Sequence, residues 1–278
     1  MPGKTGCMRL ATIRTGDEHQ CVRVDDDVAV ETGHADVGAL LIDTDWRVRA
    51  QAADGARHAL DSLDYAPLVL RPEKVICVGL NYHDHIAETG RTPPEYPTLF
   101  AKFARTLIGA HDPIQMPTVS DRVDWEAELG VVIGHEVRNA DPAGAAAAIA
   151  GYTVINDISV RDYQYRTLQW LQGKAFEATT PVGPTLLVAD GAEPAHFPIS
   201  CSVDDELMQH SNTSQLVFDP RSLIEYISAI ITLAPGDIIA TGTPGGVGHA
   251  RTPEIFLQRG QTVVTTIEGV GACVNVCR

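Results

Sequence analysis

The sequence of 278 residues contains no apolar run long enough to cross a bilayer, and residues 1–20 contain no hydrophobic signal-peptide core. We therefore expect a soluble, cytoplasmic protein with no membrane partner. Aromatic residues make up only 6% of the chain, and the hydrophobic fraction of 44% is ordinary for a globular enzyme. This length allows one large domain or a small domain followed by a larger one.

The sequence also lacks paired cysteines, because its six cysteines are scattered and none stands in a C-x-x-C pair. This pattern favours reduced, packed thiols over disulfides or a zinc site. The cysteines are Cys7, Cys21, Cys77, Cys201, Cys273 and Cys277.

Positive charge is scarce: 21 lysines and arginines face 36 acidic residues, which gives a formal net charge of −15. Nucleic acid is therefore excluded as an expected partner, since phosphate binding needs clustered basic residues. An anionic substrate would need a local cation to overcome this negative field, and a bound metal ion would supply one.

Residues 8–50 alternate short β-like segments with turn signals. The expected strands are residues 9–13, 21–24, 28–30 and 46–49, with an acidic hairpin turn at 25–27. This pattern predicts a small β-rich N-terminal domain, residues 1–70, followed by a larger domain, residues 71–278.

The rest of the chain contains more strand-like than helical segments, so we expect an α+β, β-dominated fold. Strands are expected at 75–78, 99–103, 124–134, 152–155 and 238–240, with a hairpin of 262–267 and 272–276.

Three helices are expected. One begins after an Asn81 cap, one runs from Asp141-Pro142 to Gly151, and one begins at Asp219-Pro220 and stops before Pro235-Gly236. The last has an apolar face that comprises Leu223, Ile224, Ile227, Ile230 and Ile231.

Two acidic side chains in segment 124–134 attract attention. In a strand, Glu126 and Glu128 project from the same side, and two carboxylates so close need a proton, a cation or water to offset their repulsion. Solvated glutamates on the wet face of a strand are the plain alternative. Asp157, after the apolar segment 152–155, adds a third carboxylate, and this all-oxygen set suits Mg²⁺ or Mn²⁺ better than zinc.

His85 and Glu88 are three residues apart, so a helix over residues 81–88 places them on one face. Gly90 and the proline-rich segment 93–97 follow, a composition that fits either a mobile lid or an ordinary surface loop. His83 and His85 would point apart on such a helix, which argues against a shared metal ion.

Several common site motifs are absent. His135-Glu136 lacks the second histidine of a zinc protease, residues 242–248 match neither the dinucleotide fingerprint nor the P-loop, and no G-x-S-x-G elbow is present.

Five ordered motifs, together with the 268–271 tail, resemble the fumarylacetoacetate hydrolase family over residues 70–278. The motifs occupy residues 79–88, 125–134, 151–164, 173–176 and 241–248. The resemblance implies a mixed β-roll catalytic domain, a homodimer, and a divalent cation held by Glu126, Glu128 and Asp157. That cation would be Mg²⁺ or Mn²⁺, with Ca²⁺ as a substitute.

The resemblance also implies roles for six further residues. His85 and Glu88 would activate water as a dyad, and Lys174 would stabilise negative charge on the substrate. The residues that would line the substrate site are Arg161, Gln164 and Thr243. Two positions depart from the family pattern: Gly245, where alanine is common, and Glu177, where aspartate often stands.

These residues favour one reaction first: metal-dependent hydrolysis of a C–C bond in an acylpyruvate or related β-diketo acid, through an enolate. The alternative is decarboxylation or keto–enol tautomerisation of a small anionic 2-oxo dicarboxylate such as oxaloacetate, or isomerisation of a hydroxy-diene-dioate. The intact dyad favours hydrolysis, because the alternatives have less need of an activated water. A non-catalytic metal-binding protein is a third reading. We expect residues 91–97 and 210–215 to form the acyl pocket.

Overall fold

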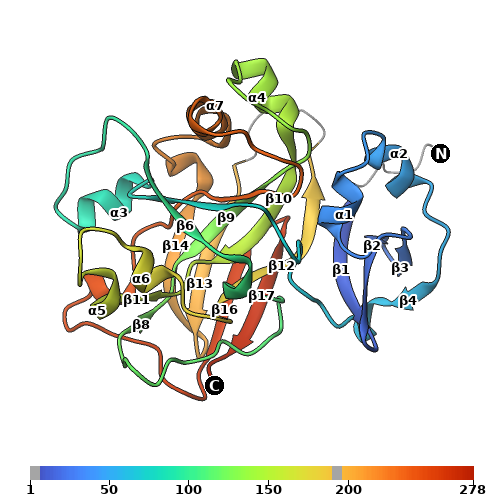
Figure 1. Ribbon diagram of the computed structural model, residues 1–278. Coiled ribbons are helices and arrows are strands. Elements are labelled where there is room, and N and C mark those ends of the chain that lie inside the picture. The colour runs from blue at the N-terminus through green and yellow to red at the C-terminus, as the bar shows by residue number, and fades with distance from the viewer. Residues whose placement is uncertain (1–6, 190–195) are drawn as a thin grey trace.

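The computed structural model describes residues 7–189 and 196–278 and consists mainly of β-strands, with short helices around them (Figure 1). The α+β, β-dominated fold class is thereby confirmed. Eleven strands form one large sheet. In order they are β4 (Arg57–Ala59), β3 (Val28–Glu31), β2 (Glu18–Val24), β1 (Arg9–Thr15), β12 (Thr180–Val188), β10 (Ile149–Asn156), β9 (Ala127–Ile133), β15 (Ile238–Ala240), β5 (Val75–Gly79) and β6 (Thr98–Lys102), with β7 (Leu107–Ile108) beside β12.

A second sheet of four strands packs against the middle of the large one, and a two-stranded ribbon completes the β-structure. The four strands are β14 (Glu206–Asn212), β13 (Pro198–Val203), β16 (Thr262–Ile267) and β17 (Gly271–Val276); the ribbon joins β8 (Val123–Asp124) to β11 (Ser159–Val160). Strands β16 and β17 form the predicted terminal hairpin.

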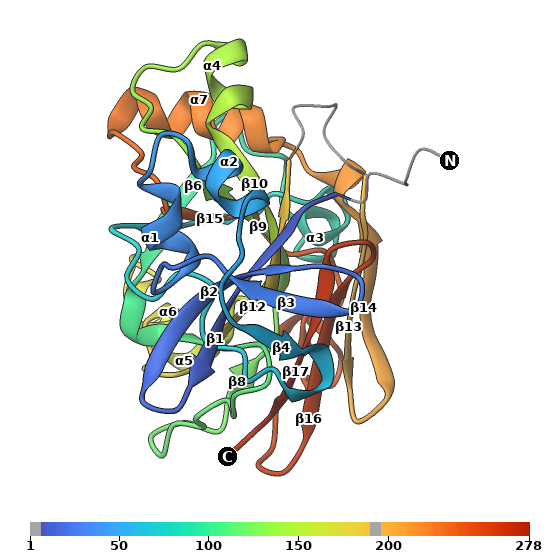
Figure 2. The ribbon, with the colours of Figure 1, turned by 90° about the vertical axis from the view of Figure 1, so that its right-hand side faces the viewer.

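Seven α-helices lie among the described residues: α1 (Val37–Leu41), α2 (Trp46–Gln51), α3 (His83–Glu88), α4 (Pro142–Ala148), α5 (Arg161–Gln164), α6 (Leu171–Lys174) and α7 (Pro220–Ile230). Helices α4 and α7 pack together at the top of both views (Figures 1 and 2). None of the helices in residues 7–189 and 196–278 combines the length and apolar character that crossing a bilayer requires.

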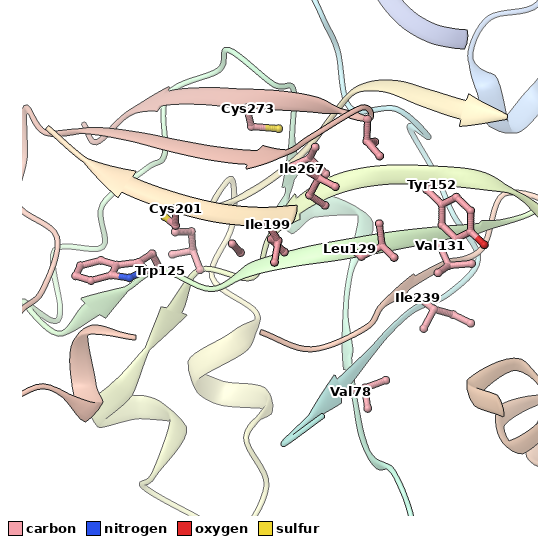
Figure 3. Close-up of a cluster of buried hydrophobic side chains, with 14 of the residues drawn as sticks. Val78, Trp125, Leu129, Val131, Tyr152, Ile199, Cys201, Ile239, Ile267 and Cys273 are labelled. Atoms are coloured by element: carbon pink, nitrogen blue, oxygen red, sulfur yellow. The ribbon is translucent and has the colours of Figure 1, made fainter. Parts of the chain in front are cut away.

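The main hydrophobic core lies between the large sheet and the four-stranded sheet (Figure 3). Strand β9 is buried along its whole length because both of its faces are covered. Leu129 and Val131 point into this core, towards Ile199 of β13, while Val132 packs on the other side of the sheet. Burial on both faces explains why this strand is an unbroken apolar run.

The N-terminal strands continue the large sheet. Strand β1 pairs with β12 through Leu10 and Leu186, and Trp46 of α2 shares a hydrophobic cluster with Val132 of β9. Figure 2 shows β1 and β2 in front of β12. The first residues are thus joined to the rest of the protein by backbone hydrogen bonds and by a common core, and a domain boundary near residue 70 remains a prediction.

Several local predictions were wrong. Residues 46–49 lie in helix α2 and not in a strand, because the buried side chains are Trp46 and Ala50, four residues apart. Helix α4 ends at Ala148, and Gly151 lies inside β10, where a Cβ would approach the carbonyl oxygen of Leu187 to 2.2 Å. Gly151 therefore permits close approach of two strands.

The apolar face of α7 is shorter than predicted. Leu223, Ile224 and Ile227 are buried, but Ile230 and Ile231 are 60% and 47% exposed. The caps Asp141 and Asp219 were predicted correctly, since each side chain accepts a hydrogen bond from a backbone N–H of its helix.

All six cysteines are free, and only Cys7 is exposed. Burial raises the pKa of the Cys21 thiol to about 12 and that of Cys277 to about 11, and it also raises the pKa values of the other three buried thiols. We therefore expect a disulfide reagent at pH 8 to modify one thiol rapidly in the native protein and all six after denaturation. Rapid reaction of a second thiol, measured by release of the reagent's chromophore, would contradict this packing.

Candidate active site

Three buried carboxylates meet at one end of the β9–β10 pair. Glu126 immediately precedes β9, Glu128 lies within it, and Asp157 follows β10. The backbone N–H of Asp157 donates to the carbonyl of Glu126 at 2.8 Å, which holds the two strand ends together. One oxygen from each of the three side chains lies within 4.8 Å of the others. The structure thus brings together the three residues singled out as metal ligands.

Basic side chains surround these carboxylates. The Nζ atom of Lys174, from α6, donates to Glu126 at 2.6 Å and to Asp157 at 2.7 Å. Arg161, at the start of α5, pairs with Glu126 at 2.7 Å. All four side chains are at most 7% exposed, so these charges interact with little solvent screening.

The environment drives the pKa values of the two glutamates in opposite directions. Burial alone would raise the pKa of Glu126, but the charges of Lys174 and Arg161 outweigh it and lower the pKa to about 2. Burial raises the pKa of Glu128 well above its usual value, and the neighbouring charges of Asp157 and Glu126 raise it further. In the metal-free site, these shifts favour the ionised form of Glu126 and the protonated form of Glu128.

Lys174 is a cation in this site and not a base. Burial would lower its pKa, but the charges of Asp157 and Glu126 have the larger combined effect and raise the pKa above its usual value. The lysine is also 4.9 Å from the centre of the Phe100 ring. It is therefore suited to offsetting negative charge, the role that the family resemblance implies.

Lys102 is a site residue that the sequence analysis missed. It lies at the end of β6, is fully buried, and its Nζ atom is 2.6 Å from Asp157 and 3.1 Å from the carbonyl oxygen of Ile158. Asp157 therefore has a lysine on each carboxylate oxygen. A lysine inside the apolar segment 98–102 was the available signal, because lysines are seldom buried without a partner.

We expect Lys102→Met to lower the melting temperature of the metal-free protein, because it leaves the carboxylate cluster with less compensating charge. Added Mg²⁺ or Mn²⁺ should restore more stability in this variant than in the native protein, since the cation replaces the missing charge. Thermal unfolding with chelator and with metal measures both effects, and Lys102→Arg, which keeps the charge, is the matched control. Equal melting temperatures in chelator would disprove this role.

Arg161 and Gln164 are buried on α5. The Arg161 guanidinium donates to Asp124 at 2.7 Å and to Gln164 at 2.9 Å, while its Nη2 atom has no hydrogen-bond partner among residues 7–189 and 196–278. Burial would lower the pKa of Arg161, but the charges of Asp124 and Glu126 raise it above its usual value. An unpartnered buried donor beside the cluster is a group that a bound molecule would satisfy.

Thr243 belongs to the glycine-rich loop, residues 241–248, that follows β15. Its hydroxyl accepts a hydrogen bond of 2.8 Å from Gln209 of β14, which fixes its position. In the same loop, the N–H of Gly242 donates to Glu128 at 2.8 Å. Gln209 was not singled out from the sequence, because a glutamine in a strand has no distinguishing pattern.

His85 and Glu88 lie on α3 and form a pair, as predicted: His85 Nδ1 is 2.6 Å from Glu88 Oε1. Their side chains are 12% and 25% exposed. The second oxygen of Glu88 accepts a hydrogen bond of 2.8 Å from the N–H of Gly246.

The predicted cap of this helix was wrong. Asn81 does not cap it, because its amide donates to the carbonyl oxygens of Phe218 and Thr241, and Tyr82 occupies the cap position.

These groups line one small cavity of about 60 Å³. Seven of the predicted site residues line it: His85, Glu126, Glu128, Arg161, Gln164, Lys174 and Thr243. Glu88 and Asp157 do not line the cavity themselves, but each is hydrogen-bonded to a residue that does: Glu88 to His85, and Asp157 to Lys174. Three aromatic residues that were not predicted, Phe100, Tyr165 and Trp170, also line the cavity. Trp170 lies so close to Gly79 that any side chain at position 79 would clash with it.

The donor set fits a hard divalent cation. It consists of three buried carboxylates and no sulfur or imidazole, and without a cation the pKa of one of them, Glu128, is raised by burial and by its acidic neighbours. Oxygen ligands of this kind suit Mg²⁺, Mn²⁺ or Ca²⁺. The carboxylate cluster can therefore hold a metal ion, whose identity the residues do not select.

Known proteins resemble this chain over the segment that builds the site. A family model described as fumarylacetoacetate (FAA) hydrolase, C-terminal, matches residues 74–278. The rat protein named mitochondrial oxaloacetate tautomerase Fahd2a is 46% identical over 229 residues, which cover 82% of this chain and 73% of the rat protein. Its mitochondrial name leaves the cytoplasmic location predicted above unconfirmed.

Two solved structures share the fold. The 5-carboxymethyl-2-hydroxymuconate delta-isomerase of Mycobacterium smegmatis superposes with a TM-score of 0.81 at 33% identity and covers 97% of this chain and 99% of its own. The fumarylpyruvate hydrolase of Pseudomonas aeruginosa, solved with Mn²⁺ and pyruvate, gives a TM-score of 0.67 at 31% identity and covers 73% of this chain and 88% of its own. The chain therefore belongs to the fumarylacetoacetate hydrolase family.

Proposed function

We propose that the protein catalyses keto–enol tautomerisation of a small 2-oxo dicarboxylate, oxaloacetate, with Mg²⁺ or Mn²⁺ at the carboxylate cluster. The observation that carries this proposal is the combination of a histidine–glutamate pair with the buried carboxylate cluster in one small cavity. The likeness to a protein named oxaloacetate tautomerase selects the substrate. This reaction was the alternative in the sequence analysis, where the histidine–glutamate pair favoured hydrolysis. A base that activates water can equally move a proton between carbon and oxygen, so the pair fits both reactions, and the likeness to the tautomerase places this one first.

A divalent cation bound by Glu126, Glu128 and Asp157 would polarise the 2-oxo group and offset the charge of the enolate. Lys174 adds a fixed positive charge beside two of these carboxylates. The buried Nη2 atom of Arg161 offers a free donor for a substrate oxygen. Groups held in place before the reaction stabilise the developing charge without reorganisation.

His85 transfers the proton. Glu88 accepts the hydrogen of Nδ1, and this leaves Nε2 as the base when the ring is neutral. Nε2 removes a proton from C3 of the keto form, the C3–H electron pair forms the C2–C3 double bond, and the C2=O electrons pass to oxygen. The same imidazolium returns its proton to that oxygen and gives the enol. No water and no other reactant is consumed, so the reaction balances as an isomerisation.

Hydrolysis of an acylpyruvate is the second candidate, and the same histidine pair supports it. A base that removes a C–H proton can also remove a proton from water, and a fumarylpyruvate hydrolase is among the structural relatives. The two reactions differ in that hydrolysis consumes a water molecule and tautomerisation does not. The likeness to a protein named oxaloacetate tautomerase is the reason that tautomerisation is placed first.

The deciding experiment measures both reactions side by side, with Mg²⁺ or Mn²⁺ and with excess chelator. Loss of the oxaloacetate enol is followed by its ultraviolet absorbance, and hydrolysis of acetylpyruvate by the appearance of pyruvate and acetate. We expect chelator-sensitive acceleration of tautomerisation and slow or no hydrolysis. Faster turnover of acetylpyruvate would establish the second candidate instead. His85→Gln is the control that we expect to be inactive. Asp17→Ala changes an exposed residue that is distant in sequence from the site residues, and we expect it to keep full activity.

A further inference from the structure

Helix α3 carries a second acidic side chain that binds the rest of the protein. Asp84 precedes His85, and its Oδ2 atom accepts a hydrogen bond of 3.0 Å from the hydroxyl of Ser211 on β14. Its Oδ1 atom accepts one of 3.2 Å from the N–H of Gly245 in the glycine-rich loop. With the bond from Gly246 to Glu88, two carboxylates of one short helix bind consecutive glycines.

These contacts matter because little else holds α3 in place. The helix has six residues, and only Ile86 among them is buried. A helix this short has little stability of its own, and a single buried apolar side chain fixes it weakly. Residues 87–91, at and beyond the C-terminal end of α3, are exposed, so this end is held by the polar contacts of Glu88 and by no buried apolar side chain.

The start of α3, in contrast, is firmly attached. The Asn81 amide donates to the carbonyl oxygens of Phe218 and Thr241, and its oxygen accepts from the N–H of Phe218. The backbone of Tyr82 forms a bridge with Leu216. A helix that is fixed at its N-terminal end and held elsewhere by polar surface contacts is built like a hinged lid.

We propose that Asp84, through Ser211 and Gly245, is the latch that keeps α3 closed over the cavity and so positions His85. Asp84 does not line the cavity, whereas His85, the next residue, and Thr89, one turn further along, do. It is therefore a positioning residue and acts through the orientation of its neighbour. The proposal rests on the proposed function in one respect, that His85 is the group that transfers the proton.

A purely local role for Asp84 makes a different prediction. Its Oδ1 atom also accepts a hydrogen bond of 2.7 Å from the N–H of His85, and a carboxylate in the first turn stabilises a helix by itself. Removal of the Ser211 hydroxyl leaves this local bond intact and breaks only the bond that crosses from α3 to β14. Ser211→Ala therefore separates the latch from the local effect.

The experiment measures amide hydrogen exchange of residues 83–89 in the full chain with Mg²⁺. The variants are Ser211→Ala, Asp84→Ala, their combination, and Asp17→Ala as a control for loss of an exposed aspartate. We expect exchange over α3 to rise about threefold in Ser211→Ala and about tenfold in Asp84→Ala, with no change in the control. The double variant should exchange no faster than Asp84→Ala, because its second substitution removes a partner that is already lost.

Oxaloacetate turnover by the same variants should fall by similar factors, while their melting temperatures stay unchanged. Unchanged exchange in Ser211→Ala, with faster exchange only in Asp84→Ala, would overturn the latch in favour of the local helix effect. Faster exchange in both variants, together with a native protein that does not tautomerise oxaloacetate, would support the latch and disprove the proposed function alone.

Discussion

Glu128→Gln is expected to abolish binding of Mg²⁺ and Mn²⁺ and yet to leave the metal-free protein at least as stable as the native one at pH 7. The neutral amide resembles the protonated carboxyl that burial and the charges of Asp157 and Glu126 favour at this position. It can still accept the hydrogen bond from Gly242. We expect at least a hundredfold loss of metal affinity, and a melting temperature in chelator that is unchanged or about 2–4 °C higher.

The sign of the stability effect follows from linkage. In the unfolded chain, Glu128 loses its proton near pH 4.5, whereas in the folded, metal-free protein it keeps the proton to a higher pH. The contribution of Glu128 to stability is therefore fully present below about pH 4.5 and is lost as pH rises towards its raised pKa in the folded protein. Glutamine needs no proton, so the variant avoids this loss.

Glu126→Gln is the matched control, because the same chemical change should have the opposite effect there. The pKa of Glu126 is lowered from 4.5 to about 2, so its charge stabilises the fold above pH 4.5, and this contribution is lost as pH falls to about 2. At pH 7 we expect Glu126→Gln to destabilise the protein by about 3 kcal/mol, a difference that narrows below pH 4.5. Calorimetry for metal binding and thermal unfolding at several pH values test the pair. Equal destabilisation of the two variants at pH 7 would contradict the assigned protonation states.

Much of this site could be predicted from the sequence because its residues lie at strand ends. Alternation along β9 places Glu126 and Glu128 on one side, and the apolar run before Asp157 identifies a second strand that leads to a carboxylate. Helical spacing alone pairs His85 with Glu88. In each case, a local period determines the geometry, and the resemblance to a known family adds which of these groups act together.

The groups that were missed depend on contacts between distant parts of the chain. Lys102 reaches Asp157 across 55 positions, and Asp84 reaches Ser211 across 127. No periodicity in the sequence reports such contacts. The misassigned segment 46–49 has a related cause: W-R-V-R alternates like a strand, but packing of Trp46 and Ala50 against one side selects a helix. Tertiary burial overrides a short local pattern.

In the proposed function, one set of residues binds the metal ion and offsets negative charge, and another set transfers the proton. The carboxylates, with Lys102, Lys174 and Arg161, form a buried set of directly paired negative and positive groups. The proton-transfer pair lies on α3, which has one buried side chain. Metal binding and proton transfer therefore reside on elements of very different stability, and substitutions should affect them independently.

His85→Ala is accordingly expected to retain native metal affinity and native melting temperature while tautomerase activity falls by about 10²–10⁴-fold. His85 makes no hydrogen bond to the carboxylate cluster among the described residues, and its side-chain partner is Glu88. The loss corresponds to removal of one positioned general base. Glu88→Gln should cause a smaller loss, because the imidazole remains but loses the carboxylate that fixes its orientation and strengthens it as a base.

Turnover of oxaloacetate, metal titration calorimetry and thermal unfolding on the same preparations test this prediction. Loss of metal affinity in His85→Ala would place the imidazole among the ligands, against its position on the lid. Retention of full activity with intact metal binding would move the base elsewhere in the cavity. The group with the required chemistry there is His249, which also lines the cavity and whose Nδ1 is 2.7 Å from Glu254. His249→Ala is therefore measured beside His85→Ala, and only the loss of activity in the latter with retention in the former supports the assignment.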